Sequence, residues 1–578
     1  LEGKHVNGNI ALMNWYSEHR WLTLANLGAK AVIFLPPTQI LPPAPAGSPE
    51  STKSIPIPLN FPRFYLPEPD ASNLLGILTS EGQVSATLRA NTYWEKTKGI
   101  NIIGLVKGTT YPEKYVMVTA YYDSGSITSS LAPGAQEASG ISCLLEIARV
   151  LAASPPKYSV LFVALGAHHQ DLGGAQAFAE DGFWPGTNPF LRLLAERIII
   201  QLNLDISTGS ETIYAVYFGN FYPYPLGGSS AGVLQGMEQH FDAVSSIWEN
   251  IMKEANQQLP REERYSFIRY WGGIQLTGHG VQADAMSWNQ RNFDSEPLKM
   301  LRLPTWTFTT IYDCRPYFMT PFDTLDNVNM HNLERQLELL YILIYRTSNL
   351  DDLFSRYITQ VISASGIGWG NFVPRAAPSG HSSPNPMNSF FKGTVAKWDE
   401  TKAWYTPVPN AIVYIRGNTP AMGFFRKILM TDKNGTFGLW GVTQFTSADI
   451  SAWVIDSSTG NPTFAPDLGQ HKYAPLAFSG PSPAADIGFM VVFPCSSMAL
   501  FNLYSPNTLR APEVYQEQLR MWIPVALSVR DHVSQAPLTY YGTWLYRTPD
   551  EVVAIVTFPP DVPVDILVNE QADRYPLA

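Results

Sequence analysis

Two adjacent histidines and several carboxylates are the side chains of this sequence best suited to chemistry. His168 and His169 follow one apolar run, and Asp123 and Asp205 follow or close two others. A neutral imidazole binds transition metals or accepts a proton, and carboxylates bind cations. One interpretation is therefore a mononuclear metal centre, formed by one or both histidines, Asp205 and Glu137, with Asp123 as a further donor.

The same residues also have a purely structural interpretation, which we favour. Adjacent residues on a loop point in different directions, so one metal ion rarely takes both His168 and His169. Without a metal, Asp123 and Asp205 are buried carboxylates that need partners, which a protonated histidine or Tyr121 would supply. Three further charged residues form a candidate ion-pair network at the same rim: Asp313, Arg315 and Asp323.

Alternating strands and helices between residues 92 and 357 must position these side chains. Apolar runs predict strands, and apolar residues at helical spacing predict helices. The expected strands are Tyr115–Ala120, Tyr158–Leu165, Ile198–Leu204 and Leu303–Thr309; the expected helices are Ser139–Ala152, Gln170–Glu180, His240–Ala255 and His331–Ser348. This pattern indicates an α/β fold, with a mostly parallel mixed sheet covered by helices on both faces. In such sheets, sites form at the carboxyl ends of the strands.

Flanking β-rich domains are expected on both sides of the α/β domain. The predicted division is a β-rich domain at 1–91, the α/β domain at 92–357, a Gly/Ser/Pro linker at 358–396, a β-sandwich at 397–480 and a β-rich domain at 481–578. Thr431–Gly435 predicts a hairpin turn. Asn434 begins an Asn-Gly-Thr sequon at its tip, where a glycan would be tolerated.

Composition limits the remaining function classes. The 578 residues are 45% hydrophobic, which excludes global disorder, and the net charge of −10 without a basic cluster argues against nucleic acid as a partner. No apolar run approaches the ~18 residues of a membrane span. The chain starts at Leu1 with no visible signal peptide, so we expect a processed or N-terminally incomplete chain.

Cysteine usage argues against a disulfide scaffold or a zinc ribbon, because the chain has only three scattered cysteines. Cys143 lies in an apolar helical run and is expected to be a buried thiol. Pairing of Cys314 with Cys495 stays open. Only 15% of the residues are charged, and 12% are aromatic. This balance suits a protein that works in contact with protein partners or with copies of itself.

Five segments of the sequence resemble the M28 family of di-zinc aminopeptidases and carboxypeptidases. They are Lys114–Ser124, Pro133–Gly140, Gly166–Gly174, Asn203–Asp205 and Met319–Asn327. The likeness covers about residues 101–345. Residues 1–90 resemble the protease-associated domain that often accompanies this family, and residues 397–445 resemble the transthyretin-like sandwich found beside carboxypeptidases. The resemblance implies an α/β domain with two zinc ions.

The resemblance places the family's first ligand position on a poor zinc ligand and leaves the second open between Gln136, which could not bridge two metal ions, and Glu137, which could. The first zinc-binding His falls on Tyr121, whose phenol has a pKa of about 10 and is a poor zinc ligand at neutral pH. The Asp that orients this His is kept as Asp123. The bridging Asp falls on Gln136 or on Glu137, depending on the direction of counting, because the loop is one residue short.

The later positions are changed as well. The family's Glu-Glu pair, general base and then ligand, falls on His168 and His169. The next carboxylate is kept as Asp205, whereas the last His falls on Met319, a thioether with little affinity for zinc. We therefore expect no catalytic residue, no bound metal and no cofactor.

The resemblance thus implies a peptidase scaffold whose di-zinc centre is lost. The family includes receptor ectodomains and secretase subunits that use the fold without hydrolysis. The favoured function is a non-catalytic extracellular or cell-surface protein in assembly, adhesion or recognition. One alternative is a metallo-exopeptidase with a rewired, mononuclear zinc site at His168, His169, Asp205 and Glu137. A weaker one is a peptide-binding protein that uses the vestigial cleft.

Overall fold

The computed structural model places most residues up to 358 and a set of strands beyond them. The described residues are 5–17, 20–37, 53, 61–82, 84–90, 97–170, 172–183, 188–216, 244, 246–269, 293–300, 303–310, 315, 317–358, 390–399, 401–402, 404–418, 424–440, 447–455, 462–466, 484–494, 522–524, 527–531, 543–547, 552–556 and 564–568. Cys314, Cys495 and Asp313 lie outside them. The pairing of Cys314 with Cys495 and the place of Asp313 in an ion-pair network therefore stay predictions.

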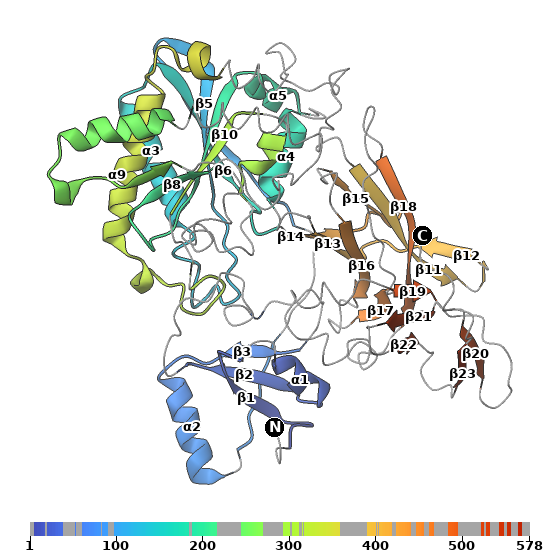
Figure 1. Ribbon diagram of the computed structural model, residues 1–578. Helices are drawn as coiled ribbons and strands as arrows, with labels where there is room; N and C mark the ends of the chain where they lie inside the picture. Colours follow the sequence, from blue (N-terminus) through green and yellow to red (C-terminus); the bar gives the residue numbers. More distant parts are fainter. Residues whose placement is uncertain are drawn as a thin grey trace.

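A seven-stranded sheet in the order β4-β6-β5-β7-β10-β8-β9 forms the centre of the α/β domain (Figure 1). Its strands are β4 (Ile102–Val106), β5 (Tyr111–Tyr121), β6 (Tyr158–Leu165), β7 (Ile198–Asp205), β8 (Ile213–Val216), β9 (Phe267–Arg269) and β10 (Thr305–Thr310). The four inner strands β6, β5, β7 and β10 run parallel, whereas β4 and β8 run antiparallel to their inner neighbours. The predicted mostly parallel mixed sheet is confirmed.

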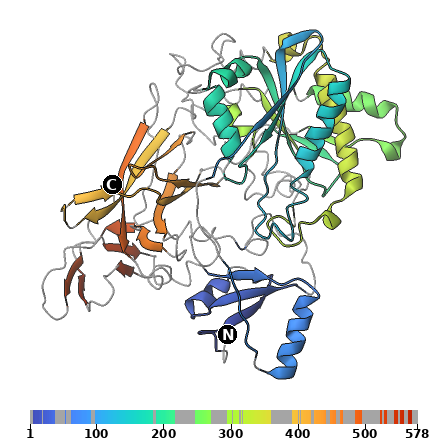
Figure 2. The same cartoon turned by 180° about the vertical axis from the view of Figure 1, so that it is seen from behind.

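Helices cover both faces of this sheet (Figures 1 and 2). One face carries α3 (Ser139–Ala153) and α9 (Met330–Thr347); the other carries α4 (Gly173–Gly182), α5 (Pro189–Ala195) and α8 (Glu296–Met300). Residues 246–257 are helical as well. The covering helices are amphipathic: α3 buries Leu144, Ile147 and Leu151 at spacings of three and four residues. The predicted helices of this region therefore form the two outer layers.

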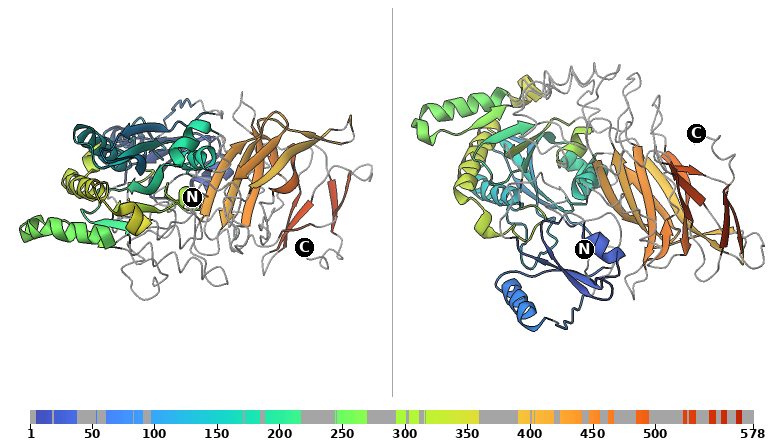
Figure 3. Two further views of the ribbon diagram at one scale, coloured as in Figure 1. Left: turned by 90° about the horizontal axis from the view of Figure 1, so that it is seen from above. Right: turned by 60° about the horizontal axis from the view of Figure 1, so that its bottom comes forward.

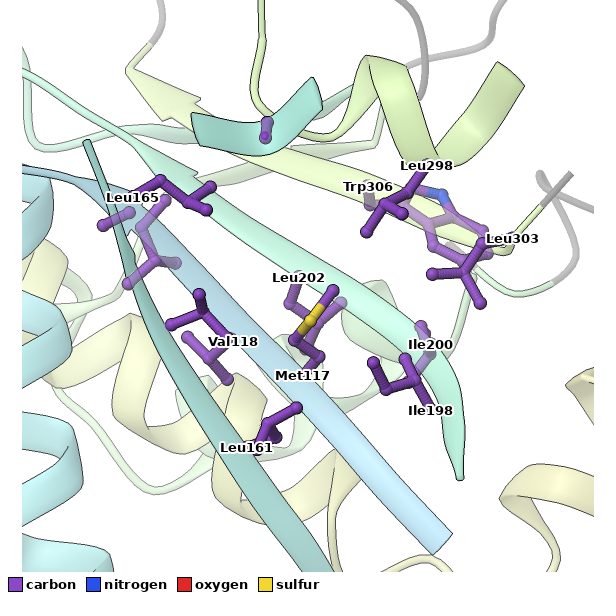
Figure 4. Packing of buried hydrophobic residues seen from close by; sticks show 14 of the residues in the cluster. Met117, Val118, Leu161, Leu165, Ile198, Ile200, Leu202, Leu298, Leu303 and Trp306 are labelled. Carbon is purple, nitrogen blue, oxygen red and sulfur yellow. The ribbon is translucent and has the colours of Figure 1, made fainter. Parts of the chain in front are cut away.

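The core of the domain lies between the sheet and these helices. Every residue of β6 and β7 is buried. Burial on both faces explains why the sequences of both strands are nearly continuous apolar runs. Figure 4 shows Met117, Leu161 and Leu202 packed together on neighbouring strands. Each such side chain contributes about 1.5–3 kcal/mol through removal from water. Cys143 is also part of this core, and burial raises the pKa of its thiol to about 12, as expected for an inert cysteine.

The N-terminal layer, residues 5–82 as described, is a three-stranded parallel sheet with two helices. Its elements are β1 (Ile10–Asn14), α1 (Trp21–Asn26), β2 (Ala31–Leu35), β3 (Arg63–Tyr65) and α2 (Asp70–Glu81). Trp15 and Phe34 form its core with an edge-to-face contact at 5.6 Å. Phe322 of the α/β domain packs edge-on against Trp15 and Tyr65, at 6.3 and 6.1 Å between ring centroids. The layer is thus docked on the α/β domain.

An eight-stranded sheet follows in the chain and stands beside the α/β domain (Figure 3). Its strands are β11 (Phe390–Asp399), β12 (Trp404–Pro407), β13 (Ile412–Asn418), β14 (Phe424–Met430), β15 (Thr436–Trp440), β16 (Ser447–Ile455), β17 (Pro462–Pro466) and β18 (Ala484–Pro494). The predicted boundaries at 397 and 480 both fall within its span. The reason is that β11 pairs with β18 in parallel, a contact across some ninety residues that no local pattern encodes.

The predicted hairpin at Thr431–Gly435 is a turn but not a hairpin. Gly435 closes it by donating its backbone N–H to the carbonyl of Asp432 at 2.9 Å. The flanking strands, however, pair with β13 and β11 rather than with each other. Asn434 is exposed at this turn. The last strands are β19 (Trp522–Pro524), β20 (Leu527–Asp531), β21 (Thr543–Arg547), β22 (Val552–Val556) and β23 (Val564–Val568), which form two small sheets.

No helix among the described residues is long and apolar enough to span a membrane.

Candidate functional site

The side chains singled out from the sequence meet at the carboxyl ends of three adjacent strands. Tyr121 ends β5, His168 and His169 follow β6, and Asp205 ends β7. These strands are direct neighbours in the order β6-β5-β7 and run parallel, so their carboxyl ends lie at one edge of the sheet. The fold therefore brings these four residues together at the edge where sites form in such sheets.

The guanidinium of Arg315 lies between Tyr121 and Asp205. Its Nη1 donates to the Tyr121 hydroxyl at 2.7 Å, and its Nη2 donates to Asp205 Oδ1 in a buried ion pair. Arg315 is 6% exposed and Asp205 2%. The sequence alone offers a protonated histidine or Tyr121 as the partner of Asp205; in the structure a guanidinium forms the direct ion pair. A guanidinium is the better partner because it is always charged and presents several donors in one plane.

His168 has a different acidic partner, Asp294, which the sequence did not reveal. His168 Nδ1 lies 2.9 Å from Asp294 Oδ2, and the imidazole stacks on the Tyr121 ring at 3.9 Å between centroids. Asp294 lies in the turn before α8, 126 residues from His168. The local signal around it, with Glu296 Oε1 accepting from the Phe293 N–H at 2.6 Å, indicates only the start of a helix.

The proton of this pair resides on His168. Burial acts to lower the pKa of His168, but Asp294, together with the charges of Asp205 and Asp123, outweighs it and raises the pKa to about 9. Burial raises the pKa of Asp294 in turn, against the opposing effect of His168. The two groups compete for one proton, and the imidazole holds it because three carboxylates surround that ring and favour its charged form. At neutral pH, His168 is an imidazolium.

Asp123 is held by backbone N–H groups of the turn after β6. Its two carboxylate oxygens accept the backbone N–H groups of His168 at 3.0 Å and of His169 at 3.2 Å. Asp123 thereby fixes the turn after β6, where Ala167 has a φ of +56°. Charge-assisted hydrogen bonds of this kind stabilise a partly buried carboxylate without a metal.

Of the two candidates for the bridging carboxylate, Glu137 faces the site and Gln136 does not. Gln136 instead connects its loop to residues 323–327. Its backbone N–H donates to Asp323 Oδ1 at 2.8 Å, and its side chain donates to the Asn327 carbonyl at 3.1 Å. Glu137 Oε2 accepts from Gly125 N–H at 3.2 Å. Its Oε1 lies 2.6 Å from His169 Nε2, yet the approach is not aligned for a hydrogen bond. The contact brings an imidazole nitrogen and a carboxylate oxygen together at the edge of the site.

Met319 and Asp323 border the site on the loop after β10. Met319 lies close to Gly125 and His169, since a Cβ on Gly125 would sit 3.0 Å from Met319 Cε and 3.2 Å from His169 Nδ1. Burial raises the pKa of Asp323 to about 6, helped by the charge of Glu137 and opposed by the Gln136 N–H and by Arg315. The charge of Arg315 thus acts on Asp323, while the predicted network as a whole stays a prediction because Asp313 lies outside the described residues.

Strained backbone gathers around this site. Of the five non-glycine residues with positive φ in the described chain, four flank it and one lies in the eight-stranded sheet: Ala167 (+56°), Leu172 (+60°), Arg315 (+38°), Met319 (+55°) and Asn410 (+56°). Such conformations cost about 1–3 kcal/mol each and persist only where the surroundings impose them. The loops that carry His168, Arg315 and Met319 are therefore held in place by their contacts.

The residues present do not fit a pair of zinc ions. The Asp205 carboxylate and the Tyr121 hydroxyl are engaged by a guanidinium, and a thioether stands at Met319 where the family places an imidazole. The Nδ1 atom of His168 is engaged by Asp294 at 2.9 Å. Across the described part of the chain, no group of three or more His, Cys, Asp and Glu side chains is arranged to hold a metal ion.

Comparisons with known proteins agree on the α/β domain. The model of Peptidase family M28 matches residues 101–343. Aminopeptidase YwaD of Bacillus subtilis is 24% identical over 281 residues, which are 47% of this chain and 50% of that protein. Aminopeptidase NAALADL1 of Rattus norvegicus is 32% identical over 120 residues, 19% of this chain and 14% of that protein. The match to a probable zinc metalloprotease of Leptosphaeria maculans is 33% over 117 residues, 19% of this chain and 25% of that protein.

Solved structures were compared as well. A zinc aminopeptidase from Bacillus subtilis is 19% identical, with a TM-score of 0.31, over 60% of this chain and 71% of that one. The M28 peptidase precursor from Shewanella amazonensis is 16% identical, with a TM-score of 0.33, over 61% and 71%. The chain spans half or less of the length of the curated relatives above. Residues 101–343 are nevertheless matched as one unit, and this chain therefore contains a domain of peptidase family M28.

Proposed function

We propose that this protein is a non-catalytic M28-like protein that acts in assembly, adhesion or recognition outside the cell or at its surface. Strands β6, β5 and β7 of the α/β domain align their carboxyl ends, and the described side chains at those ends contact one another. The flanking β-rich regions add surface for protein partners or for a second copy of the chain.

One observation carries this proposal: Arg315 forms a buried ion pair with the carboxylate of Asp205. Asp205 is the one metal-ligand position that the resemblance leaves unchanged. A carboxylate paired with a buried guanidinium is not a free ligand. The proposal gains support from His168, which stands where the family places its general base. An imidazolium with a pKa of about 9 cannot accept a proton from water at neutral pH.

Exposed apolar side chains support the interaction part of the proposal. Ile102 and Leu105 of the edge strand β4 are 58% and 48% exposed, and Leu145 of the adjoining helix α3 is 62% exposed. Exposed large apolar side chains on the edge strand of a sheet and on the adjoining helix are typical of contact surfaces. A protein partner or a second copy of this chain would cover them.

Two measurements test the proposal. The first is the turnover of a panel of aminoacyl p-nitroanilides and dipeptides, with and without added zinc. The wild-type chain should show no more turnover than the Arg315→Met and Asp205→Ala variants. Sedimentation and cross-linking should detect self-association or a partner that Ile102→Asp and Leu145→Asp weaken. Turnover that is lost in Asp205→Ala but present in the wild-type chain would refute the non-catalytic function.

The second candidate is a metallo-exopeptidase with a mononuclear site, and one contact favours it. His169 Nε2 and Glu137 Oε1 lie 2.6 Å apart. They are a nitrogen and an oxygen donor of the kinds that zinc binds, and both lie beside the site. It predicts zinc-dependent turnover that is lost in His169→Ala. The weaker candidate, a peptide-binding protein that uses the same edge, predicts peptide binding without turnover, measurable by fluorescence anisotropy.

A further inference from the structure

We infer that Arg315 is an internal cation that has taken over the structural role of a metal ion in this M28 domain. Its guanidinium joins the carboxyl ends of β5 and β7 to the loop after β10. The inference concerns what holds the domain together, so it holds or fails independently of the partner-binding function.

The charge balance at the site requires such a cation. Among the described residues, five carboxylates gather at this edge of the sheet, and four of them have the partners described above: Asp123, Glu137, Asp294 and Asp323. Asp205, the fifth, is 2% exposed and forms its ion pair with Arg315. An unpaired carboxylate at this depth would cost several kcal/mol or would have to take up a proton.

The geometry of Arg315 suits this role better than that of any lysine would. One guanidinium reaches two metal-ligand positions of the family at once, Tyr121 through Nη1 and Asp205 through Nη2. A planar fork with several donors can bridge two oxygen atoms in fixed directions, as a metal ion does. The phenol at position 121 is a poor zinc ligand but a good hydrogen-bond acceptor for a guanidinium. A tyrosine at position 121 and an arginine at position 315 therefore suit each other.

Backbone strain shows that the position of Arg315 is imposed by its contacts. Its φ of +38° is unfavourable for any side chain with a Cβ atom, as is the φ of +55° at Met319. The buried ion pair and the hydrogen bond to Tyr121 supply the stabilisation that holds the loop in this state. The same loop continues to Asp323, which binds the Gln136 N–H, and to Phe322, which touches the N-terminal layer.

A double-mutant cycle tests the inference on the full chain, with thermal unfolding in EDTA as the readout. Arg315→Met should lower the Tm by roughly 10 °C, because it leaves Asp205 buried and unpaired. Arg315→Met with Asp205→Asn should recover more than half of that loss, because both charges are then absent. The matched control is Arg149→Met, which breaks the exposed pair with Glu146 and should shift the Tm by no more than about 2 °C.

Two further results decide the inference if Arg315→Met does not fold. Arg315→Lys keeps the charge but not the fork, and it should fold with a Tm between those of the wild type and the double variant. The Tm of the wild-type chain should be the same in EDTA as in excess zinc. A wild-type Tm that falls in EDTA together with loss of a bound metal would overturn the inference, as would an Arg315→Met variant as stable as the wild type.

Discussion

At the scale of single residues, His168 shows how the environment of one side chain decides its chemistry. It stands where the resemblance expects a carboxylate base, and Asp294, Asp205 and Asp123 surround it. A cluster of carboxylates favours the protonated imidazole. His168 therefore already carries a proton at neutral pH and cannot act as a base. Its role is to balance charge in the site.

The raised pKa of His168 predicts a pH-dependent stability. The folded-state value of about 9 lies above the 6.5 of an unperturbed histidine, so the folded state holds the extra proton. The resulting stabilisation, of the order of 3 kcal/mol, is fully present below pH 6.5 and is lost as the pH rises through 9. Urea unfolding midpoints between pH 6 and 10 measure it. His168→Gln should remove this part of the pH dependence; equal profiles for both proteins would contradict the assignment.

Gly134 offers a second prediction at the scale of residues. Its φ is +93°, and a Cβ there would lie 2.8 Å from Glu137 Oε2 and press on Ser124 Oγ. Gly134→Ala should therefore destabilise the protein by about 1–3 kcal/mol. Gly76→Ala is the matched control, because Gly76 lies within helix α2 with nothing within 4 Å of its added methyl group. It should be neutral or stabilising by up to about 1 kcal/mol. Equal effects in thermal unfolding would refute this explanation.

At the scale of elements, the order β6-β5-β7 brings Tyr121, His168 and Asp205 together. The sequence predicted this because apolar runs define the strands, and parallel strands place their carboxyl ends at one edge. It could not predict that Asp294 reaches His168 or that Arg315 reaches Asp205, since these contacts join residues 126 and 110 positions apart. Local patterns carry no information on such pairs, and the same holds for the β11–β18 pairing.

Helix α3 allows a test of how the helical layer stabilises the sheet. Leu144 is 3% exposed and packs in the core, whereas its neighbour Leu145 is 62% exposed. Leu144→Ala should cost about 2–5 kcal/mol, because it removes buried methyl groups and leaves a cavity. Leu145→Ala should change the free energy of unfolding by less than about 0.5 kcal/mol. Comparable losses for both variants in chemical denaturation would mean that α3 is oriented differently.

At the scale of the whole molecule, the N-terminal layer and the site share one loop. Phe322 lies three residues after Met319 and packs against Trp15 and Tyr65 of that layer. Edge-to-face aromatic pairs contribute about 0.5–1.5 kcal/mol each beyond their burial. The docking of the N-terminal layer is therefore coupled to the order of the loop that carries Arg315.

This coupling predicts the effect of removing the Phe322 ring. Phe322→Ala should loosen the N-terminal layer and make the loop at residues 315–323 more accessible, because both lose a shared contact. Limited proteolysis followed by mass spectrometry should then find faster cleavage in that loop, by about tenfold for a loss of ~1.4 kcal/mol. Phe190→Ala removes a ring that is 63% exposed and serves as the control. An unchanged cleavage rate in Phe322→Ala would show that the two parts are independent.

The central claim is that organic cations, above all the guanidinium of Arg315, stand where the family holds zinc. The most direct test is the metal content of the full chain, purified without chelator and analysed for all transition metals. We predict less than about 0.1 equivalents of zinc per chain, since no Lewis acid is needed to hold the site together. One or two equivalents that disappear in Asp205→Ala or His169→Ala would contradict the claim and point to a working metal centre.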